Sequence, residues 1–226
     1  MATNSTISKP AFDFLKQLEK NNNRDWFEEH KSEFKTHEKA VKSFFEAVKD
    51  NLNHHDDIEK MKMFRIYRDV RFSKDKTPYK SHFAGSFSRL GANLRGGYYM
   101  HLKPGESFLA TGFWAPNKED LFRIRKELEM DASEFRQVIG NPDFKAVWGE
   151  LKGETVKTAP KGFDKEHPDI DLIKHKQYIF VRNFADQEVL SPQFLGEVDR
   201  SYRAIRPYFD LMSDVLTTNL NGESLL

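Results

Sequence analysis

Apolar side chains recur with helical spacing through the first quarter of the chain. Ser8 or the Lys9–Pro10 pair is suited to start a short helix, which stops at the 21–23 asparagine run. Asn23 can then cap a long amphipathic helix that continues to about residue 52. The pattern therefore predicts N-terminal helices over 8–52.

Between residues 64 and 72 the pattern changes to alternation of apolar and polar side chains, which is typical of a half-buried strand. Arg68 breaks the alternation because it falls on the apolar side. An unpaired interior guanidinium costs several kcal/mol, on the order of its desolvation penalty. Arg68 therefore either pairs with an acid, of which Asp69 and Asp75 are nearest, or the strand ends or bulges there and frees Arg68 and Arg71 into a cleft.

Further strands follow, and with residues 64–72 they make 64–114 the sheet-forming region. The Lys103–Glu106 segment contains Pro104 and Gly105 in the positions that a type II turn favours, so it predicts a turn between two strands. The expected strands after the basic stretch are 82–90, 97–103, 107–114 and 177–182.

Helical patterns with their own cap residues occupy 117–152, and a last helix is expected over 191–219, kinked or split at Pro207. Residues 154–176 are irregular and polar. No regular alternation of strand and helix is present, which indicates an α+β fold: a single antiparallel sheet of about four to six strands packed against N-terminal, central and C-terminal helices. We expect one domain over 1–226.

Composition narrows the functional classes. The chain has 226 residues, 36 Lys plus Arg, 35 Asp plus Glu and a net charge of +1, which is not the strongly basic balance of a dedicated nucleic-acid domain. Twenty Phe residues suggest an aromatic core, and the lack of Cys excludes disulfides, thiolate metal sites and Cys nucleophiles. Neither a signal peptide nor a membrane-spanning run is evident, so we expect a cytoplasmic protein that does not enter a membrane.

Known catalytic and cofactor signatures are also missing: the sequence has no phosphate-binding glycine loop, dinucleotide fingerprint, zinc-protease motif or nucleophile elbow. No cofactor is expected. His30 and His37 share a helix face but are separated by about 10.5 Å of helical rise, too far to hold one ion. His54 and His55 beside two Asp residues are typical of a solvated connector, and we expect no metal site.

The densest chemistry lies between Lys60 and His82, where eight Lys or Arg residues stand against two acids. Three interpretations are open. The arginines could pair with acids elsewhere and connect the sheet to the helices. They could instead form a pocket for a phosphate or carboxylate, since Arg and Lys around a loop are suited to anion recognition. The interleaved aromatic residues could also stack nucleic-acid bases, although the neutral overall charge counts against this.

Candidate site residues come from this stretch, from the neighbouring strands and from a Pro/Gly loop at 160–168. A two-residue turn at 104–105 would place His101 opposite Phe108, where it is either a packed residue or a proton-transfer group. The 160–168 loop is either a plain surface loop or brings Lys161, Asp164 and His167 to the site. The expected ligand-binding residues are Arg65, Tyr67, Arg68, Arg71, Lys74, Tyr79, Lys80, His82, Tyr99, Trp114 and Lys161; the candidates for catalysis are His101, Asp69 and Asp75.

Four segments carry a resemblance: NNNRDWFEEHKSEF at 21–34, FRIYRDVRFSKDKTPYKSHF at 64–83, GGYYMHLKPGESFLATGFWAP at 96–116 and APKGFDKEHPDI at 159–170. Together, in this order, they resemble a widespread, mainly bacterial family called domain of unknown function 2461. The resemblance implies a single-domain protein and assigns no activity, substrate, cofactor or catalytic residue.

Our leading hypothesis is therefore a cytoplasmic small-ligand protein, enzyme or not, that binds a phosphate- or carboxylate-bearing ligand in an Arg/Lys-rich cleft. The alternative is a nucleic-acid or protein interaction module without catalytic activity. The sequence indicates no oligomeric state.

Overall fold

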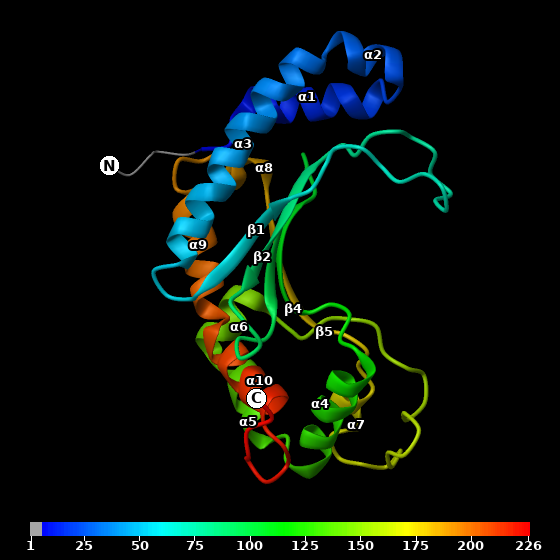
Figure 1. Cartoon of the computed structure of the whole chain (residues 1–226), viewed down its shortest axis with the longest axis vertical. Coiled ribbons are helices and arrows are strands. Elements are labelled where there is room, and N and C mark those ends of the chain that lie inside the picture. The colour runs from blue at the N-terminus through cyan, green and yellow to red at the C-terminus, as the bar shows by residue number, and fades with distance from the viewer. Residues whose placement is uncertain (1–5) are drawn as a thin grey trace. The chain divides into compact units, whose positions relative to one another are not determined.

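The computed structural model describes residues 6–226. Its centre is one antiparallel sheet, which confirms the predicted α+β class (Figure 1). The strands lie in chain order across the sheet, although residues 114–177 separate the last two strands in the chain. They are β1 (Ile58–Met63), β2 (Phe83–Arg89), β3 (Gly97–Leu102), β4 (Ser107–Phe113) and β5 (Tyr178–Phe184).

Contacts divide the chain into two compact units. Unit 1 holds Met1–Phe87, Tyr99–Leu109 and Asn183–Arg200, and unit 2 holds Ser88–Tyr98, Ala110–Arg182 and Ser201–Leu226. The single domain expected from the sequence stays a prediction. Among the described residues no helix is both long and apolar enough to cross a membrane.

Unit 1 begins with the helices α1 (Lys9–Lys20), α2 (Arg24–Glu29) and α3 (Lys31–Leu52). Ser8 and Asn23 cap α1 and α2 through their side chains, as predicted. The expectation of one continuous helix from residue 23 to about 52 is wrong, because the chain bends at His30. There the backbone leaves helical geometry (φ −103°, ψ 9°), and the imidazole Nδ1 lies 2.8 Å from the Trp26 carbonyl oxygen.

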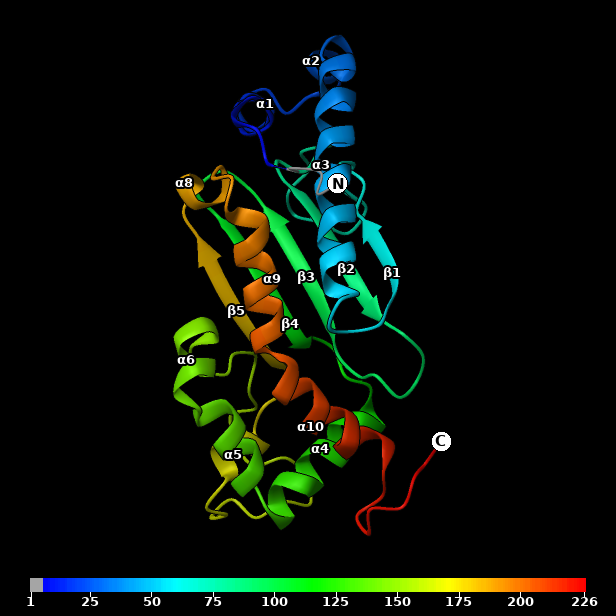
Figure 2. The same cartoon turned by 90° about the vertical axis from the view of Figure 1, so that its left-hand side faces the viewer.

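Helix α3 covers one face of the strands of unit 1. Its Phe34 and Phe45 rings stack on Phe83 and Phe87 of β2, with ring centroids 6.0 and 5.8 Å apart. Figure 2 shows α3 in front of β2, with β1 on one side of it and α9 (Phe194–Ala204) on the other. The short helix α8 (Asp186–Val189), which the sequence did not predict, precedes α9.

Unit 2 contains the predicted central helices, and their caps at Asn117 and Asn141 are formed. The last helix is split as expected: it restarts with Pro207 in its first turn, where a missing N–H leaves no hydrogen bond unmade. Buried aromatic side chains, among them Trp148 and Tyr208, fill the core. The helices are α4 (Lys118–Met130), α5 (Ser133–Gly140), α6 (Pro142–Trp148), α7 (Ile170–Ile173) and α10 (Arg206–Thr217).

The predicted strand at 64–72 is wrong. The regular strand is β1, which lies earlier in the chain, and Phe72 is 96% exposed where the alternation placed it on an apolar face. The alternation from 64 onward belongs to a segment that leaves the sheet and returns as β2 (Figure 1). Its side chains are therefore distributed over two faces of a projecting hairpin.

Candidate functional site

Residues 64–83 form a hairpin-like extension of β1 and β2 in unit 1. Its two arms are joined by backbone hydrogen bonds from Arg68 to Pro78 (2.9 Å) and from Lys80 to Ile66 (2.8 Å). Tyr67 and Tyr79 form an antiparallel bridge between the arms. Opposite residues in such a pair share a face, so Arg68 and Lys80 lie on the face opposite the two tyrosines.

The face that carries Tyr67 and Tyr79 packs against the N-terminal helices. Tyr79 stacks on Phe27 of α2 with ring centroids 3.9 Å apart, and Tyr67 meets the same ring edge-on at 6.1 Å. The Asn22 side chain forms hydrogen bonds with both backbone groups of Tyr79, at 2.9 and 3.1 Å. These two predicted ligand-binding tyrosines therefore anchor the extension.

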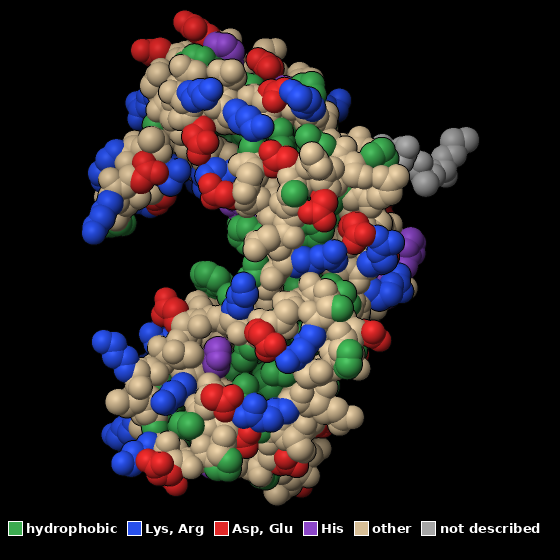
Figure 3. All heavy atoms as spheres, turned by 180° about the vertical axis from the view of Figure 1, so that it is seen from behind, with side chains coloured by type: hydrophobic (Ala, Val, Ile, Leu, Met, Phe, Trp, Pro, Cys, Tyr) green, Lys and Arg blue, Asp and Glu red, His purple; other side chains and the backbone are tan. Residues whose placement is uncertain are grey.

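In the loop at the tip of the extension, residues 69–77, Asp69 holds a neighbouring cation. Asp69 binds Arg71 through two side-chain hydrogen bonds of 2.7 and 3.0 Å, and both side chains are exposed. Lys74 is exposed on the same loop. Basic and acidic side chains stand together on this loop, which projects on the left of Figure 3. The expected convergence of cations therefore does not extend to Arg71 and Lys74.

On the sheet face opposite α3, three rings stand in a row across neighbouring strands. The His82 and His101 rings have centroids 4.1 Å apart, and His101 stacks on Phe108 at 4.7 Å. The Tyr99 hydroxyl lies 3.1 Å from Nδ1 of His101. We call His82, His101 and Phe108, together with Tyr99 and Phe64, the ring row.

The ring row results from strand alternation. Met100 and Leu102 of β3 are buried on one face of the strand, whereas Tyr99 and His101 point to the other face and are half-buried. The tight turn after β3, with Gly105 at φ 77° and a Glu106 N–H to Lys103 carbonyl bond of 3.0 Å, sets the register. This is the turn that the sequence predicts.

Two lysines lie over one end of the ring row. Lys62 and Lys80 place their ammonium nitrogens 5.6 and 5.9 Å from the centroid of the Phe64 ring. Phe64 itself lies 6.3 Å from Tyr99, centroid to centroid. The cations and the rings therefore form one continuous surface in unit 1.

Burial and positive charge keep both histidines of the row neutral at neutral pH. Burial, then the charges of His101, Lys80 and Arg68, lower the pKa of His82 from 6.5 to about 3. Burial, followed by the charge of Lys103, lowers the pKa of His101 to about 4. Imidazoles in this state donate one N–H and offer one acceptor nitrogen each.

The cations around the row are only partly balanced. Arg68 pairs with Asp75 at 3.0 Å, and Asp75 is held in turn by the Thr77 backbone and hydroxyl at 2.9 and 2.7 Å. Within the described chain, however, the buried Nε of Arg68 has no hydrogen-bond partner. Lys103 pairs with Glu106, so its charge is largely compensated.

Lys80 differs from these two cations. Burial lowers its pKa, and the charges of Arg65 and Arg68 lower it further. No ion pair of Lys80 or of the exposed Arg65 with an acid of residues 6–226 is found within 4.0 Å. The uncompensated charge of Lys80 therefore lies beside the half-buried ring row, and the exposed Arg65 adds a second positive charge near Lys80.

The structure thus brings together five of the predicted site residues on one surface of unit 1, which we call the cation–ring face: Arg68, Lys80, His82, Tyr99 and His101. The charge of the exposed Arg65 acts on Lys80. Lys62, Lys103, Phe64 and Phe108 also belong to the cation–ring face, and strand alternation around the predicted turn could have identified Lys103 and Phe108.

Two predicted residues, Trp114 and Lys161, belong to unit 2 and are exposed there. In the 160–168 loop, His167 bonds the Asp169 backbone N–H and lies 3.1 Å from the Glu129 carbonyl oxygen, so it fixes the loop. Across residues 6–226, no group of three or more His, Asp or Glu side chains could hold a metal ion.

Fold and surface together define an α+β protein with a half-buried cation–ring face on an antiparallel sheet. Residues 10–211 match the family described as "Conserved hypothetical protein (DUF2461)", and the chain belongs to this family. Comparison with curated proteins gave no match, and comparison with solved structures gave none either.

Proposed function

We propose that the cation–ring face binds a small ligand that bears a phosphate or a carboxylate, with Lys80 and Arg68 contacting the anion. The observation that carries the proposal is Lys80, which is partly desolvated beside Arg65 and Arg68 without an acidic partner within 4.0 Å in the described chain. Like charges in a partly desolvated site repel one another, and an anion placed between them removes that cost. Perturbed ionisable groups of this kind cluster at functional sites.

The neighbouring groups suit an anion as well. The partly exposed guanidinium of Arg68 can donate to a ligand oxygen, and each neutral imidazole of the histidine pair can donate one N–H. His101 and Phe108 stack on each other, so their faces are covered and their edges are the parts that a ligand can meet. The edge of an aromatic ring is its positive side, which suits an anion. No step of a reaction is needed to explain these features, and the proposal is one of binding.

A nucleic acid is the second candidate because the exposed loop continues the basic–aromatic pattern. Phe72 is 96% exposed with the Arg71 guanidinium 6.0 Å from its ring centroid, which suits stacking of an unpaired base. The rings of the cation–ring face favour the small anion, because they already contact one another or a lysine. The cytoplasmic location expected from the sequence stays a prediction.

Titration calorimetry at low ionic strength with inorganic phosphate, citrate and a short single-stranded oligonucleotide tests the proposal. We expect phosphate or citrate to bind the unmodified protein and Lys80→Gln to weaken this binding at least about five-fold, the factor given by an ion pair worth about 1 kcal/mol. Lys74→Gln, which removes the same charge from the exposed loop, is the matched control and should bind as the unmodified protein does.

Two results would contradict the small-anion proposal. Either Lys80→Gln binds as tightly as the unmodified protein, or only the oligonucleotide binds and loses affinity equally in Lys80→Gln and Lys74→Gln. The latter result, with a steep decrease in affinity as salt is added, would support the nucleic-acid candidate.

Asp75→Asn provides an independent check. Asp75 competes with a ligand for Arg68, and Asn keeps an oxygen that can accept from Thr77. We expect the affinity for phosphate to rise about three- to five-fold, consistent with loss of a competing exposed pair. An unchanged or lower affinity would exclude Arg68 from the anion site.

A further inference from the structure

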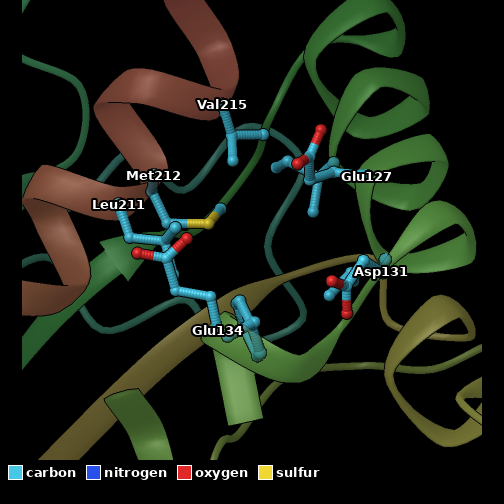
Figure 4. A pocket seen from close by; sticks show the side chains of 9 residues that line it. Glu127, Asp131, Glu134, Leu211, Met212 and Val215 are labelled. Atoms are coloured by element: carbon cyan, nitrogen blue, oxygen red, sulfur yellow. The ribbon is translucent and has the colours of Figure 1, made fainter. Parts of the chain in front are cut away.

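A small pocket in unit 2, separate from the cation–ring face, lies between α4, α5 and α10. Its volume is about 80 Å³. Figure 4 shows Met212 and Val215 entering it from α10, with the Glu127 and Asp131 carboxyl groups on the α4 side. The pocket is lined by Ile124, Glu127, Leu128, Asp131, Glu134, Phe135, Leu211, Met212 and Val215.

The floor of the pocket is apolar and fixed. Five of its residues are at most 6% exposed and belong to the core that joins the three helices; they are Ile124, Leu128, Phe135, Met212 and Val215. A group the size of a water molecule needs about 10–15 Å³ of such a cavity, so the cavity holds roughly five to eight groups of this size. That is the size of a short alkyl chain or of one aromatic ring.

The rim carries three carboxylates, and no lining residue is basic. Glu127 is already paired with Arg123 at 2.6 Å, so its charge is compensated. Hydrogen bonds from the Ser133 side chain and from the Ser133 backbone N–H, the latter 2.8 Å long, lower the pKa of the Asp131 carboxyl group. Neither Asp131 nor Glu134 forms an ion pair with a described basic residue. Two uncompensated negative charges therefore stand over an apolar cavity.

This combination selects the chemistry of a ligand. A metal ion is not favoured, because no group of three or more His, Asp or Glu side chains among residues 6–226 is arranged to hold one. An anion would be repelled by the rim, and a neutral apolar molecule would use the floor alone. Only a molecule with a short apolar body and one positive charge uses both parts of the pocket.

We propose that this pocket binds a small organic ammonium compound, whose apolar body fills the cavity and whose charge lies beside Asp131 and Glu134. The proposal does not depend on the function proposed for the cation–ring face. The ammonium group stays at the solvated rim, so the apolar floor contributes much of the affinity and the carboxylates select the charge.

Calorimetry on the full chain with benzylammonium, benzyl alcohol and benzoate tests the proposal, because the three molecules share a ring and differ in charge. We expect benzylammonium to bind about five-fold or more tightly than benzyl alcohol, the factor given by one exposed ion pair, and benzoate to bind more weakly than both. In the double variant Asp131→Asn, Glu134→Gln the advantage of benzylammonium over the alcohol should disappear. Glu129→Gln, which removes a charge of α4 that does not line the pocket, should keep it.

Leu211→Phe, which narrows the pocket from the half-buried side of α10, should weaken binding of both benzylammonium and the alcohol. Its melting temperature shows whether the variant is folded. The proposal is overturned if benzylammonium does not bind, if it binds no more tightly than the alcohol, or if the double variant keeps the full preference for the ammonium group.

Discussion

Replacement of Lys80 by Met should stabilise the unliganded protein, although it removes a side chain that the proposed function needs. Burial lowers the pKa of Lys80, and the charges of Arg65 and Arg68 lower it further, so the folded state disfavours the ammonium group. Met keeps most of the apolar stem that lies near the Phe64 ring while removing the charge. The substitution therefore removes the two repulsions together with the weak cation–π contact to Phe64.

The expected gain is modest because Lys80 is only partly buried. Interactions between partly exposed charges are worth about 0.2–1 kcal/mol each. Relief of two repulsions, from Arg65 and Arg68, should thus raise the free energy of unfolding by about 1 kcal/mol. For a chain of 226 residues this raises the melting temperature by about 2–4 °C.

Thermal unfolding at low ionic strength, with and without phosphate or citrate, measures both the relief of charge repulsion and the loss of anion binding. The unmodified protein should be less stable without anion and should gain stability when anion is added. Lys80→Met should start at a higher melting temperature and gain little, and Lys74→Met should behave as the unmodified protein does. A lower melting temperature of Lys80→Met without anion would refute the repulsion, and an unchanged response to anion would refute the binding role.

Two further predictions concern the fold and its pH dependence. Gly85→Ala should destabilise the protein by about 1–3 kcal/mol in urea unfolding, because a Cβ there would stand 2.6 Å from the Phe45 ring. Gly140→Ala is the control: its Cβ would enter open space, so this variant should be neutral or slightly stabilising. Equal effects of the two substitutions on the free energy of unfolding would contradict the close packing at Gly85. The folded-state pKa values of His82 (about 3) and His101 (about 4) lie below 6.5, so the unfolded chain binds more protons and stability should fall as the pH decreases from about 6.5 toward 4. His82→Gln should make the free energy of unfolding fall less steeply with decreasing pH. The change in slope should be less than about 1.4 kcal/mol per pH unit, because the His82 ring is partly solvated. An unchanged slope would show that the pKa of His82 is not lowered in the folded protein.

The sequence predicts β3 and β4 well because the alternation in each strand agrees with the turn residues between them. Alternation in 97–103 and 107–114 matches β3 and β4, and Gly105 in the turn adopts the positive φ that its position requires. The strand at 64–72 was placed wrongly because alternation alone does not distinguish a sheet strand from a projecting hairpin. β1, with the sequence IEKMKM, has too few apolar side chains to give a clear pattern.

The candidate site was predictable as far as it depends on neighbouring strands. His101 and Phe108 face each other because the turn fixes their register. The role of Tyr67 and Tyr79 depends on Phe27, which is remote in the chain, and nothing local in the sequence indicates that contact. Which partner a charged side chain finds in the fold also depends on residues that are remote in the chain.

The position of a bound anion tests the proposed anion-binding function most directly. A crystal of the protein soaked in selenate, measured at the selenium absorption edge, reveals each bound anion by its anomalous signal. We predict a selenate whose oxygens lie within about 3 Å of the Lys80 ammonium and of the Arg68 guanidinium. Selenate bound only elsewhere on the molecule, with Lys80 exposed to solvent alone, would contradict the anion-binding function.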